Sequence, residues 1–373
     1  MSGFRLFSPP YSLHAREWAR YLAKKLRYDR DVLTARQRDQ LIEATHEFKQ
    51  LAESQLPDQE GDKRLKALND RHHALLQRPL HHGWRENVEV IFIALVLSLV
   101  IRAYFLQPFK IPTHSMRPTL YGIVQTQCEG PKPSFWRQAY EWMRWGRSYH
   151  RLEVKRAGQL ISIADKKWLG IRILPIAVTE VRIDDDRYTL WCTTRDLEEA
   201  GYQFAAYASV KEGEELINFT INQGDHVFVN KMAYHFKLPK KGDVFVFSTA
   251  GIQELLKRYG VTQYYIKRCM GVGGDTLQIE PPYLKANGKR LTGFPFERIY
   301  SMQNGYHGYA FGGLYLTSPE DSYQVAPDHF WAMGDNSQGS FDSRGWGPVA
   351  RRNLVGSALM VYWPFSKRWG WIQ

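Results

Sequence analysis

The chain has 373 residues, a formal net charge of +12 and an apolar fraction of 44%. This length allows more than one domain, and the composition is that of a globular protein, which excludes wholesale disorder. A basic balance suits nucleic acid, anionic lipid or simple solubility. The Lys and Arg residues are spread along the chain without zinc-finger spacing or an RNA-binding signature, so we expect no nucleic-acid partner.

The three cysteines are Cys128, Cys192 and Cys269. None belongs to a C-x-x-C pair, and an odd number excludes a fully paired framework. Cys128 and Cys192 could form a bridge in an oxidising compartment. The alternative, small buried thiols, stays open.

Residues 1–86 are predicted to form a helical, basic N-terminal region. Positions 12–55 contain no proline and few β-branched residues, and leucines and aromatic residues recur there at helical spacing. Pro57 and Gly61 are expected to break the pattern before a further helical piece near 63–76. The pattern favours a small helical hairpin with solvated faces and no catalytic role.

An apolar run follows at residues 90–101, where Ser98 is the one mildly polar member. Twelve residues are too few to cross a bilayer, but apolar flanks extend the run to 87–106, and a helix of that length measures about 30 Å. Arg102 can extend its head group to the interface, and Tyr104 suits an aromatic belt. We predict one transmembrane helix over 87–106. The excess of Lys and Arg in the N-terminal region favours that end inside.

Residues 107–373 are predicted to form a β-rich domain. Short segments rich in valine and aromatic residues are bounded by Gly, Pro, Asn or Asp, which is typical of strands. These segments are 225–230, 243–247, 263–266 and 358–362. One helix is expected at 252–259.

An insert at about 124–222 is harder to interpret. It holds an aromatic and basic stretch at 135–151 and predicted strands at 177–183 and 188–194. The aromatic C-terminal run at 362–371 either rests on a bilayer or belongs to the core.

The most informative motif, residues 109–120, begins just after the apolar helix. Its prolines hold the backbone extended around Ser115 and Met116. A serine in a rigid turn so close to a bilayer helix is placed for reaction at the membrane surface. Four further motifs follow in chain order, at 224–234, 242–247, 264–275 and 333–346.

Together these ordered motifs resemble the sequence boxes of bacterial type I signal peptidases, which are membrane-anchored serine–lysine endopeptidases. The order is P-x-x-S-M-x-P-T-L, G-D-x-x-x-V-N-K, G-D-V-x-V-F, Y-x-K-R and G-D-N-S followed by S-x-D-S-R. The resemblance implies a mainly β catalytic domain of antiparallel sheets, and no cofactor.

The resemblance also implies the catalytic roles. Ser115 would be the nucleophile and Lys267 its general base. The Ser115 backbone N–H and the Thr113 hydroxyl would bind the oxyanion. Ser340 would orient the lysine amine.

Two further sets of roles follow from the same resemblance. Asp342 and Arg344 would form an ion pair that supports the site without reacting. The substrate-binding residues would be Met116, Pro118, Tyr265 and Ile266.

A lysine base must be neutral. At its ordinary pKa of about 10.4, an amine is neutral in only about one molecule in a few thousand at pH 7. The apolar neighbours Tyr264, Tyr265, Ile266 and Met270 are expected to lower the pKa of Lys267, because an apolar setting disfavours an ammonium.

The chain departs from the family pattern in places that remove no reacting group. Gly273 replaces a proline in G-x-P-G-D, and Gln338 and Gly339 replace a charged or amide pair. The region 1–86 and most of the insert have no family counterpart, and their roles stay open.

Each of the main candidate residues could instead have an ordinary surface or structural role. Lys267 could be a surface lysine beside Arg268, and Asp342 and Arg344 a surface pair. His114 adjoins Ser115, but neighbouring side chains of an extended segment point apart, which makes it a poor base. His329 fits a structural role. No cluster of His, Cys, Asp or Glu has metal-ligand spacing, so no metal is expected.

The resemblance implies an endopeptidase that removes N-terminal signal peptides from exported preproteins. The substrate would lie extended along a strand edge, and shallow apolar pockets would select small residues before the cut. We expect a single-pass monomer in the bacterial cytoplasmic membrane, with its catalytic domain on the outer face. The alternatives are an inactive membrane-tethered scaffold of the same fold and a self-cleaving serine–lysine repressor-like protease. A bilayer span at 88–106 disfavours the second.

Overall fold

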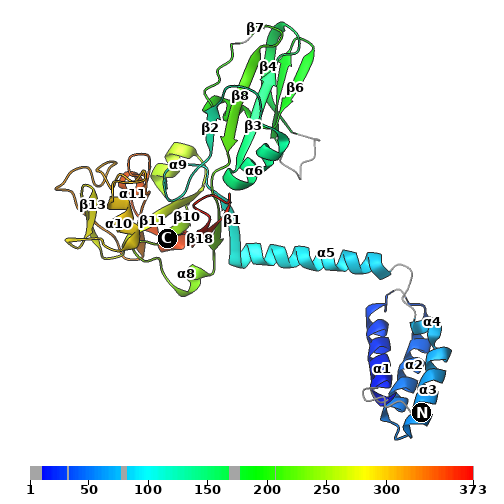
Figure 1. Ribbon diagram of the computed structural model, residues 1–373. Helices are drawn as coiled ribbons and strands as arrows, with labels where there is room; N and C mark the ends of the chain where they lie inside the picture. Colours follow the sequence, from blue (N-terminus) through cyan, green and yellow to red (C-terminus); the bar gives the residue numbers. More distant parts are fainter. Residues whose placement is uncertain (1–10, 32, 77–81, 168–176, 206, 373) are drawn as a thin grey trace, which may run out of the picture. The chain divides into compact units, whose positions relative to one another are not determined.

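The computed structural model describes residues 11–31, 33–76, 82–167, 177–205 and 207–372. The chain divides into two compact units, Met1–Val96 and Leu97–Gln373. Figure 1 shows helices in the first and a largely β architecture in the second. The prediction of a mainly β domain preceded by a helical region is confirmed.

The first unit is built from antiparallel helical packing. Its helices are α1 (Tyr11–Tyr28), α2 (Ala35–Glu53), α3 (Asp58–Arg71) and α4 (His73–Leu76). Thr34 starts α2 with a reciprocal capping box to Gln37, which satisfies free N–H groups at that end. Leu22, Leu41 and Phe48 are fully buried and centre the core between the helices.

The sequence predicts a break in the helical pattern at Gly61, but the structure has no break there. Pro57 precedes the first turn of α3, and Gly61 lies inside that helix. A Cβ at Gly61 would stand 2.2 Å from Cδ1 of Tyr11. Glycine is therefore required here because the Tyr11 ring rests directly on the helix backbone.

Helix α5 (His82–Val100) continues into a π-helical turn (Ile101–Phe105). The stretch Asn87–Phe105 has a mean hydropathy of 2.3, and none of it is buried against the rest of the chain. By length and composition this helix is able to cross a membrane. Strand β1 begins at Leu106, directly after the helical turn.

The central sheet of the second unit has eight strands, all antiparallel, in the order β1-β9-β18-β10-β11-β16-β17 with β19 on β18. Their bounds are β1 (Leu106–Lys110), β9 (His226–Asn230), β10 (Val244–Ser248), β11 (Tyr264–Val272), β16 (His329–Met333), β17 (Val349–Ala350), β18 (Leu354–Trp363) and β19 (Gly370–Trp371). The four strands predicted for this part of the chain correspond to β9, β10, β11 and β18. In the described residues β1 pairs only with β9, so its other edge is free.

A second sheet, in the order β14-β13-β12-β15, packs with a helix on its own aromatic core. Its strands are β12 (Thr276–Glu280), β13 (Tyr283–Ala286), β14 (Lys289–Arg290) and β15 (Tyr323–Gln324), and the helix is α10 (Phe294–Tyr300). The short helices near the central sheet are α8 (Ala233–Phe236), α9 (Gln253–Tyr259), α11 (Ser343–Trp346) and a 3-10 turn (Arg351–Asn353). Helix α9 agrees with the helix expected at 252–259.

The insert forms two further sheets around a core of its own, in the orders β2-β8-β3 and β6-β5-β4-β7. Its elements are β2 (Val124–Gln127), α6 (Phe135–Trp145), β3 (Arg147–Glu153), β4 (Gly158–Lys167), β5 (Ala177–Ile183), β6 (Asp186–Leu190), α7 (Thr194–Glu199), β7 (Ser209–Val210) and β8 (Glu215–Asn222). In Figure 1 these strands, drawn in cyan-green to green, extend away from β11 and β13.

Two local predictions for the insert change. The strand expected at 188–194 ends at Leu190, because Thr193 instead caps α7 in a capping box with Asp196. Cys128 and Cys192 are both free thiols.

Candidate active site

The segment that carries Ser115 lies between β1 and β2 and is tied to the start of β9. The Ile111 backbone N–H donates to the Asp225 carbonyl at 2.9 Å, and the Tyr121 N–H donates to the Asp225 carboxylate at 2.7 Å. Asp225 is fully buried and also accepts two hydrogen bonds from Arg368, at 2.7 and 2.8 Å. Both ends of the serine loop are therefore fixed to one buried residue, one end through the backbone carbonyl of Asp225 and the other through its carboxylate.

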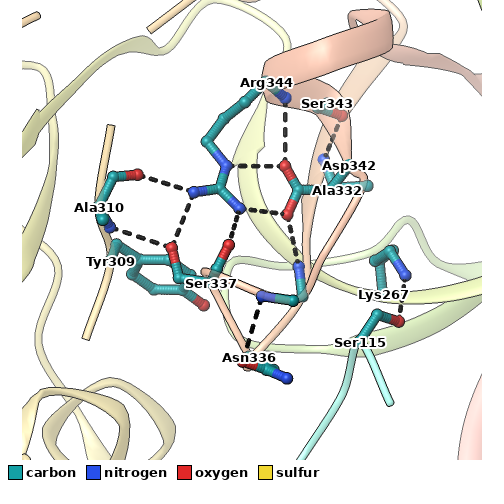
Figure 2. Close-up of polar contacts among 12 residues, drawn as sticks. Ser115, Lys267, Tyr309, Ala310, Ala332, Asn336, Ser337, Asp342, Ser343 and Arg344 are labelled. Carbon is teal, nitrogen blue, oxygen red and sulfur yellow. Dashed lines mark hydrogen bonds and ion pairs between the residues drawn. The ribbon is translucent and has the colours of Figure 1, made fainter. Parts of the chain in front are cut away.

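Ser115 and Lys267 meet although 152 residues separate them in the sequence. The Lys267 Nζ lies 2.5 Å from the Ser115 Oγ, as Figure 2 shows. Lys267 comes from β11, where it pairs with Phe245 of β10. Only 7% of Ser115 and 4% of Lys267 is exposed to solvent. The alternative of a surface lysine is therefore wrong.

Burial lowers the pKa of Lys267 from its ordinary value to about 8. Asp342 and Asp335 act in the opposite direction, and Arg344 lowers the pKa further. At this pKa the amine is neutral in about one molecule in ten at pH 7. The site therefore holds an amine that can accept a proton from the adjoining hydroxyl.

The proposed oxyanion groups lie on the same loop. The Thr113 Oγ1 is 3.5 Å from the Ser115 Oγ, and Thr113 is exposed. In the described part of the chain, the Ser115 backbone N–H has no hydrogen-bond partner. A free N–H and a hydroxyl beside the nucleophile are donors available to a developing oxyanion.

Asp342 and Arg344 form a buried, bidentate ion pair rather than a surface pair. The Arg344 Nε donates to Asp342 Oδ1 and its Nη2 to Oδ2, each at 2.8 Å. Arg344 also donates to the Ala310 carbonyl and to the Ser337 side chain and carbonyl (Figure 2). The Asp342 carboxylate in turn accepts the Gly334 N–H at 3.1 Å. The pair thus joins three loops around the dyad.

Ser340 lies beside the dyad without a hydrogen bond to it. Its Oγ is buried and has no partner among the residues that the structure describes. A Cβ placed on Gly334 would stand 2.3 Å from that oxygen and 2.3 Å from the Ser115 carbonyl oxygen. Ser340 is thus close to the Ser115 backbone, and its effect on the lysine stays a prediction.

Two residues of the G-D-N-S motif hold the nucleophile, and sequence reasoning assigned them no role. The Asn336 backbone N–H donates to the Ser115 carbonyl at 3.0 Å, and its side-chain amide donates to the His114 carbonyl at 3.3 Å. Gly334 allows this approach because it has no Cβ. The signal was present in the quoted motif, but a single sequence does not show which carbonyl a motif residue contacts.

Replacing Gly334 by alanine is expected to lower kcat/KM by about 10- to 100-fold, because the new methyl group must displace the Ser115 carbonyl or Ser340. The measurement is steady-state cleavage of a short peptide in detergent. The far-ultraviolet circular dichroism of the variant serves as the control for folding. Activity equal to that of the parent would contradict the tight contact.

A second buried ion pair, also missed in the sequence, lies next to the dyad. Arg268 donates to both oxygens of Asp335, at 2.8 and 2.7 Å, and neither side chain is exposed. Arg268 also donates to the Gly242 carbonyl, and Asp335 accepts from Thr119 of the serine loop. The pair therefore links β11, the G-D-N-S loop and the serine loop.

The four residues predicted to bind substrate have different surroundings. Met116 is fully buried in the core under the central sheet, whereas Pro118, Tyr265 and Ile266 are half-buried. The Tyr265 ring centre is 5.4 Å from the Lys267 Nζ. Met116 therefore anchors the serine loop in the core. Pro118, Tyr265 and Ile266 each keep part of their surface exposed for contact with a substrate.

An open groove of about 920 Å³ is lined by residues from both β1 and β11, among them Gln107 and Tyr264. The Phe109 and Tyr264 rings are 5.7 Å apart, so these two strands face each other near the groove. The free edge of β1 lies on the same strand. The strand β1 therefore has a free backbone edge beside this groove, whose lining does not include Ser115 or Lys267.

The histidines do not join the dyad. The His114 ring makes no hydrogen bond in the described part of the chain, and burial lowers its pKa. The His329 Nδ1 donates to the Pro327 carbonyl at 2.8 Å, which fits a structural role. Within the described residues, no three His, Cys, Asp or Glu side chains are grouped to bind a metal.

Comparisons with known proteins agree with this arrangement. The family model described as signal peptidase, peptidase S26, matches residues 84–126 and 207–363, which is more than half of the chain. The chain therefore belongs to the S26 signal peptidase family. The two matched parts contain Ser115 and Lys267, and they leave out residues 127–206, the greater part of the insert.

The names of individual relatives agree with this family assignment. Signal peptidase I of Leptolyngbya laminosa is 32% identical over 171 residues, which cover 44% of this chain and 72% of the relative. Signal peptidase I of Bacillus amyloliquefaciens is 28% identical over 167 residues, covering 44% and 80%. A solved signal peptidase I from Enterococcus faecalis V583 is similar over 32% of this chain and 97% of its own, with 21% identity and a TM-score of 0.25. The prediction of an enzyme of the signal peptidase I type is confirmed.

Proposed function

We propose that this enzyme removes signal peptides through a Ser115–Lys267 dyad and a covalent acyl-enzyme. The observation that carries the proposal is the 2.5 Å separation of Nζ and Oγ at a buried lysine. Burial favours the neutral amine, and only a neutral amine can serve as a base. Among the described residues the Lys267 Nζ has no ion-pair partner, which an active enzyme explains better than an inactive scaffold does.

The reaction proceeds in two halves. Neutral Lys267 accepts the Ser115 proton while Oγ attacks the scissile carbonyl carbon, and the Ser115 N–H and the Thr113 hydroxyl donate to the oxyanion. The lysine ammonium then gives its proton to the leaving amine, which frees the mature protein. Water, deprotonated by Lys267, hydrolyses the ester on Ser115 and releases the signal peptide.

The signal peptide would bind extended along the free edge of β1, opposite the start of β11. Pro118, Tyr265 and Ile266 would border the residues before the cut. Half-buried side chains leave shallow pockets, and these accept alanine and reject larger side chains. The oxygens and N–H groups of the β1 edge would supply binding without sequence specificity.

The helix Asn87–Phe105 would anchor the enzyme in the bacterial cytoplasmic membrane as a single span. The excess of Lys and Arg in the N-terminal region supports a catalytic unit on the outer face. Because β1 starts directly after the helix, the active site would lie near the bilayer, where signal peptides end. We propose a monomer, since the dyad and both buried ion pairs come from one chain.

The test uses the purified full chain with a preprotein, together with the Ser115→Ala and Lys267→Ala variants. Both variants are expected to lose at least ~10⁴-fold in kcat, because nucleophile and base act as a unit. Ser301→Ala, at an exposed serine outside the site, is the matched control. Cleavage by either dyad variant at the rate of the parent would refute the mechanism.

A further inference from the structure

Three arginines line a cavity of about 380 Å³ beside the serine loop. They are Arg117 of that loop, Arg147 at the start of β3 and Arg368 near the C-terminus. Within the described residues, no carboxylate belongs to the lining, so the cavity wall is strongly basic. The family match includes Arg117 but neither of the other two arginines. The cavity as a whole therefore lies outside what the family model describes.

The insert brings Arg147 to the cavity through helix α6. In Figure 1, α6 lies at the end of the insert that faces the central sheet, and the Trp142 ring is 5.2 Å from the Trp363 ring of β18. Trp136 and Tyr140 of the same helix stay exposed. Strand β3 begins with Arg147 directly after the turn that ends α6. The fold of the insert therefore fixes the position of this arginine.

Two of the three arginines have a carboxylate partner outside the cavity lining. Arg368 donates two hydrogen bonds to Asp225, at 2.7 and 2.8 Å. Arg147 donates to Glu141 at 3.3 Å, and Arg137 donates to the same carboxylate at 3.0 Å. The two carboxylates therefore offset at most two of the three positive charges at the cavity, and one of them is shared with an arginine outside it.

Arg117 lacks such a partner. Its buried Nε makes no hydrogen bond within the described residues, and its guanidinium has no ion-pair partner there. This guanidinium is 4.8 Å from the centre of the Tyr121 ring, and the Arg368 guanidinium is 4.0 Å from the same ring. Two like charges at one ring repel each other. An anion in the cavity would offset this repulsion and give the Arg117 Nε an acceptor.

Neutral donors complete the lining. The Ser366 Oγ accepts the Arg368 backbone N–H at 3.2 Å, so its hydroxyl proton can donate into the cavity. The Asn222 side-chain oxygen accepts from the Arg147 Nε at 3.3 Å, which leaves its NH₂ group as a donor. Phosphate has several acceptor oxygens, and the planar fork of arginine donates to two of them at once. This set of donors therefore suits a phosphate group better than chloride.

The cavity adjoins the backbone of the serine loop. Gly122 lines the cavity, and a Cβ there would stand 2.4 Å from the Thr113 carbonyl carbon. Gly224 also lines it, and a Cβ there would stand 2.6 Å from the Ile111 carbonyl oxygen. Arg117 belongs to the same loop. An anion in the cavity is thus connected by direct packing to the segment that carries the nucleophile and the Thr113 hydroxyl.

We propose that the cavity binds one phosphate group, and that the bound group holds the serine loop in its catalytic position. Arg117, Arg147 and Arg368 donate to the phosphate oxygens. The ligand is an effector rather than a substrate, because neither Ser115 nor Lys267 lines the cavity. A soluble phosphate compound and a lipid headgroup both carry this group. Binding is independent of the proposed function, whereas the effect on cleavage rests on it.

The first test measures binding by isothermal titration calorimetry, with the full chain in an uncharged detergent and inorganic phosphate as the ligand. The parent is expected to bind one phosphate per chain, and sodium chloride should weaken the binding by screening. Arg147→Gln and Arg117→Gln should each lose at least ~tenfold in affinity, because each removes one charged fork.

The controls separate loss of the site from loss of the fold. Arg117→Gln breaks no ion pair in the described part of the chain, so its circular dichroism should match that of the parent. Arg187→Gln changes an exposed arginine of β6 outside the cavity and should bind phosphate like the parent. No saturable binding to the parent, or equal affinity in the parent and Arg117→Gln, would overturn the proposal.

The same calorimetry separates the two sources of the phosphate group. The ligands are inorganic phosphate and a short-chain, monomeric phosphatidylglycerol, and the part of the binding that Arg117→Gln removes is compared. Tighter binding of the lipid would assign the cavity to a headgroup, and tighter binding of inorganic phosphate would assign it to a soluble anion. If Arg117→Gln removes the binding of neither ligand, the proposal is overturned.

The effect on the serine loop is measured by cleavage of a short soluble peptide in the same detergent. Phosphate should raise kcat at least ~threefold and leave KM unchanged, because it positions the nucleophile rather than the peptide. The half-saturating phosphate concentration should equal the Kd and should rise in Arg147→Gln by the same factor. Binding without a change in kcat would overturn the coupling to the loop. If the parent does not cleave the peptide, the proposed function fails, and calorimetry still decides the phosphate site.

Discussion

Lys267→Met is expected to abolish cleavage and, at the same time, to raise the free energy of unfolding at pH 7. Methionine fills a similar volume without a charge, whereas the parent must keep an amine with a pKa of about 8 in a buried site. The difference from the ordinary value of 10.5 corresponds to up to about 3 kcal/mol. A gain of this size would be large against the usual net stability of a domain.

The pH dependence gives this prediction its control. Below pH 8 both the folded and the unfolded parent carry the ammonium, so the penalty of a buried charge is complete. Between about pH 8 and 10.5 the folded state loses its proton first, and the parent gains stability relative to the methionine variant. Denaturant unfolding in detergent at pH 7 and pH 10 should therefore show a difference that shrinks with pH. A parent more stable than the variant at pH 7 would be inconsistent with a destabilised ammonium.

Asp335→Ala is expected to lower the free energy of unfolding by about 3–5 kcal/mol, because it leaves the Arg268 guanidinium buried without its counter-ion. Arg268 would keep its hydrogen bond to the Gly242 carbonyl, which carries no compensating charge. The same change releases Thr119 of the serine loop, so activity should fall as well. Denaturant unfolding followed by tryptophan fluorescence measures the stability.

Two further variants serve as matched controls for Asp335→Ala. Asp328→Asn breaks the exposed pair with Arg351, keeps a residue type that tolerates the positive φ at this position, and is expected to change stability by less than about 1 kcal/mol. The double variant Arg268→Met with Asp335→Leu removes both charges, and it should recover much of the stability lost in Asp335→Ala. A similar small loss in Asp335→Ala and Asp328→Asn would show that the buried pair is not held as described.

The catalytic unit was largely predictable because its strands carry strong local signals. Val244–Ser248 and His226–Asn230 are short β-branched and aromatic segments with polar boundaries, and they form strands near the predicted positions. Ser115 and Lys267 were identified through ordered motifs, and the fold brings them within hydrogen-bond distance. Local pattern therefore predicted the strands, whereas the family resemblance predicted the pair.

Other features depend on contacts that no local pattern specifies. Gly61 was expected to break a helix, but the Tyr11 ring on its surface requires a glycine inside α3. The roles of Gly334 and Asn336 depend on the Ser115 carbonyl, which lies more than two hundred positions earlier in the chain. The pairing of Arg268 with Asp335 likewise depends on a tertiary contact, because β11 and the G-D-N-S loop come together only in the folded chain.

The insert was the least predictable part. The residues at 188–194 have a strand-like composition, but Thr193 favours a helix cap through Asp196. The stretch at 135–151 contains both a helix and a strand, divided at Gly146. Its aromatic residues gave no indication of exposure, because a buried and a solvent-facing aromatic stripe have the same spacing.

The central claim, a neutral lysine as the base for Ser115, is tested most directly by the pH dependence of kcat/KM on a soluble peptide between pH 5.5 and 10. The rate should rise about tenfold per pH unit and level off near pH 8, the pKa of Lys267. A rate that levels off near pH 6 would instead indicate a histidine base such as His114, and would contradict the lysine mechanism.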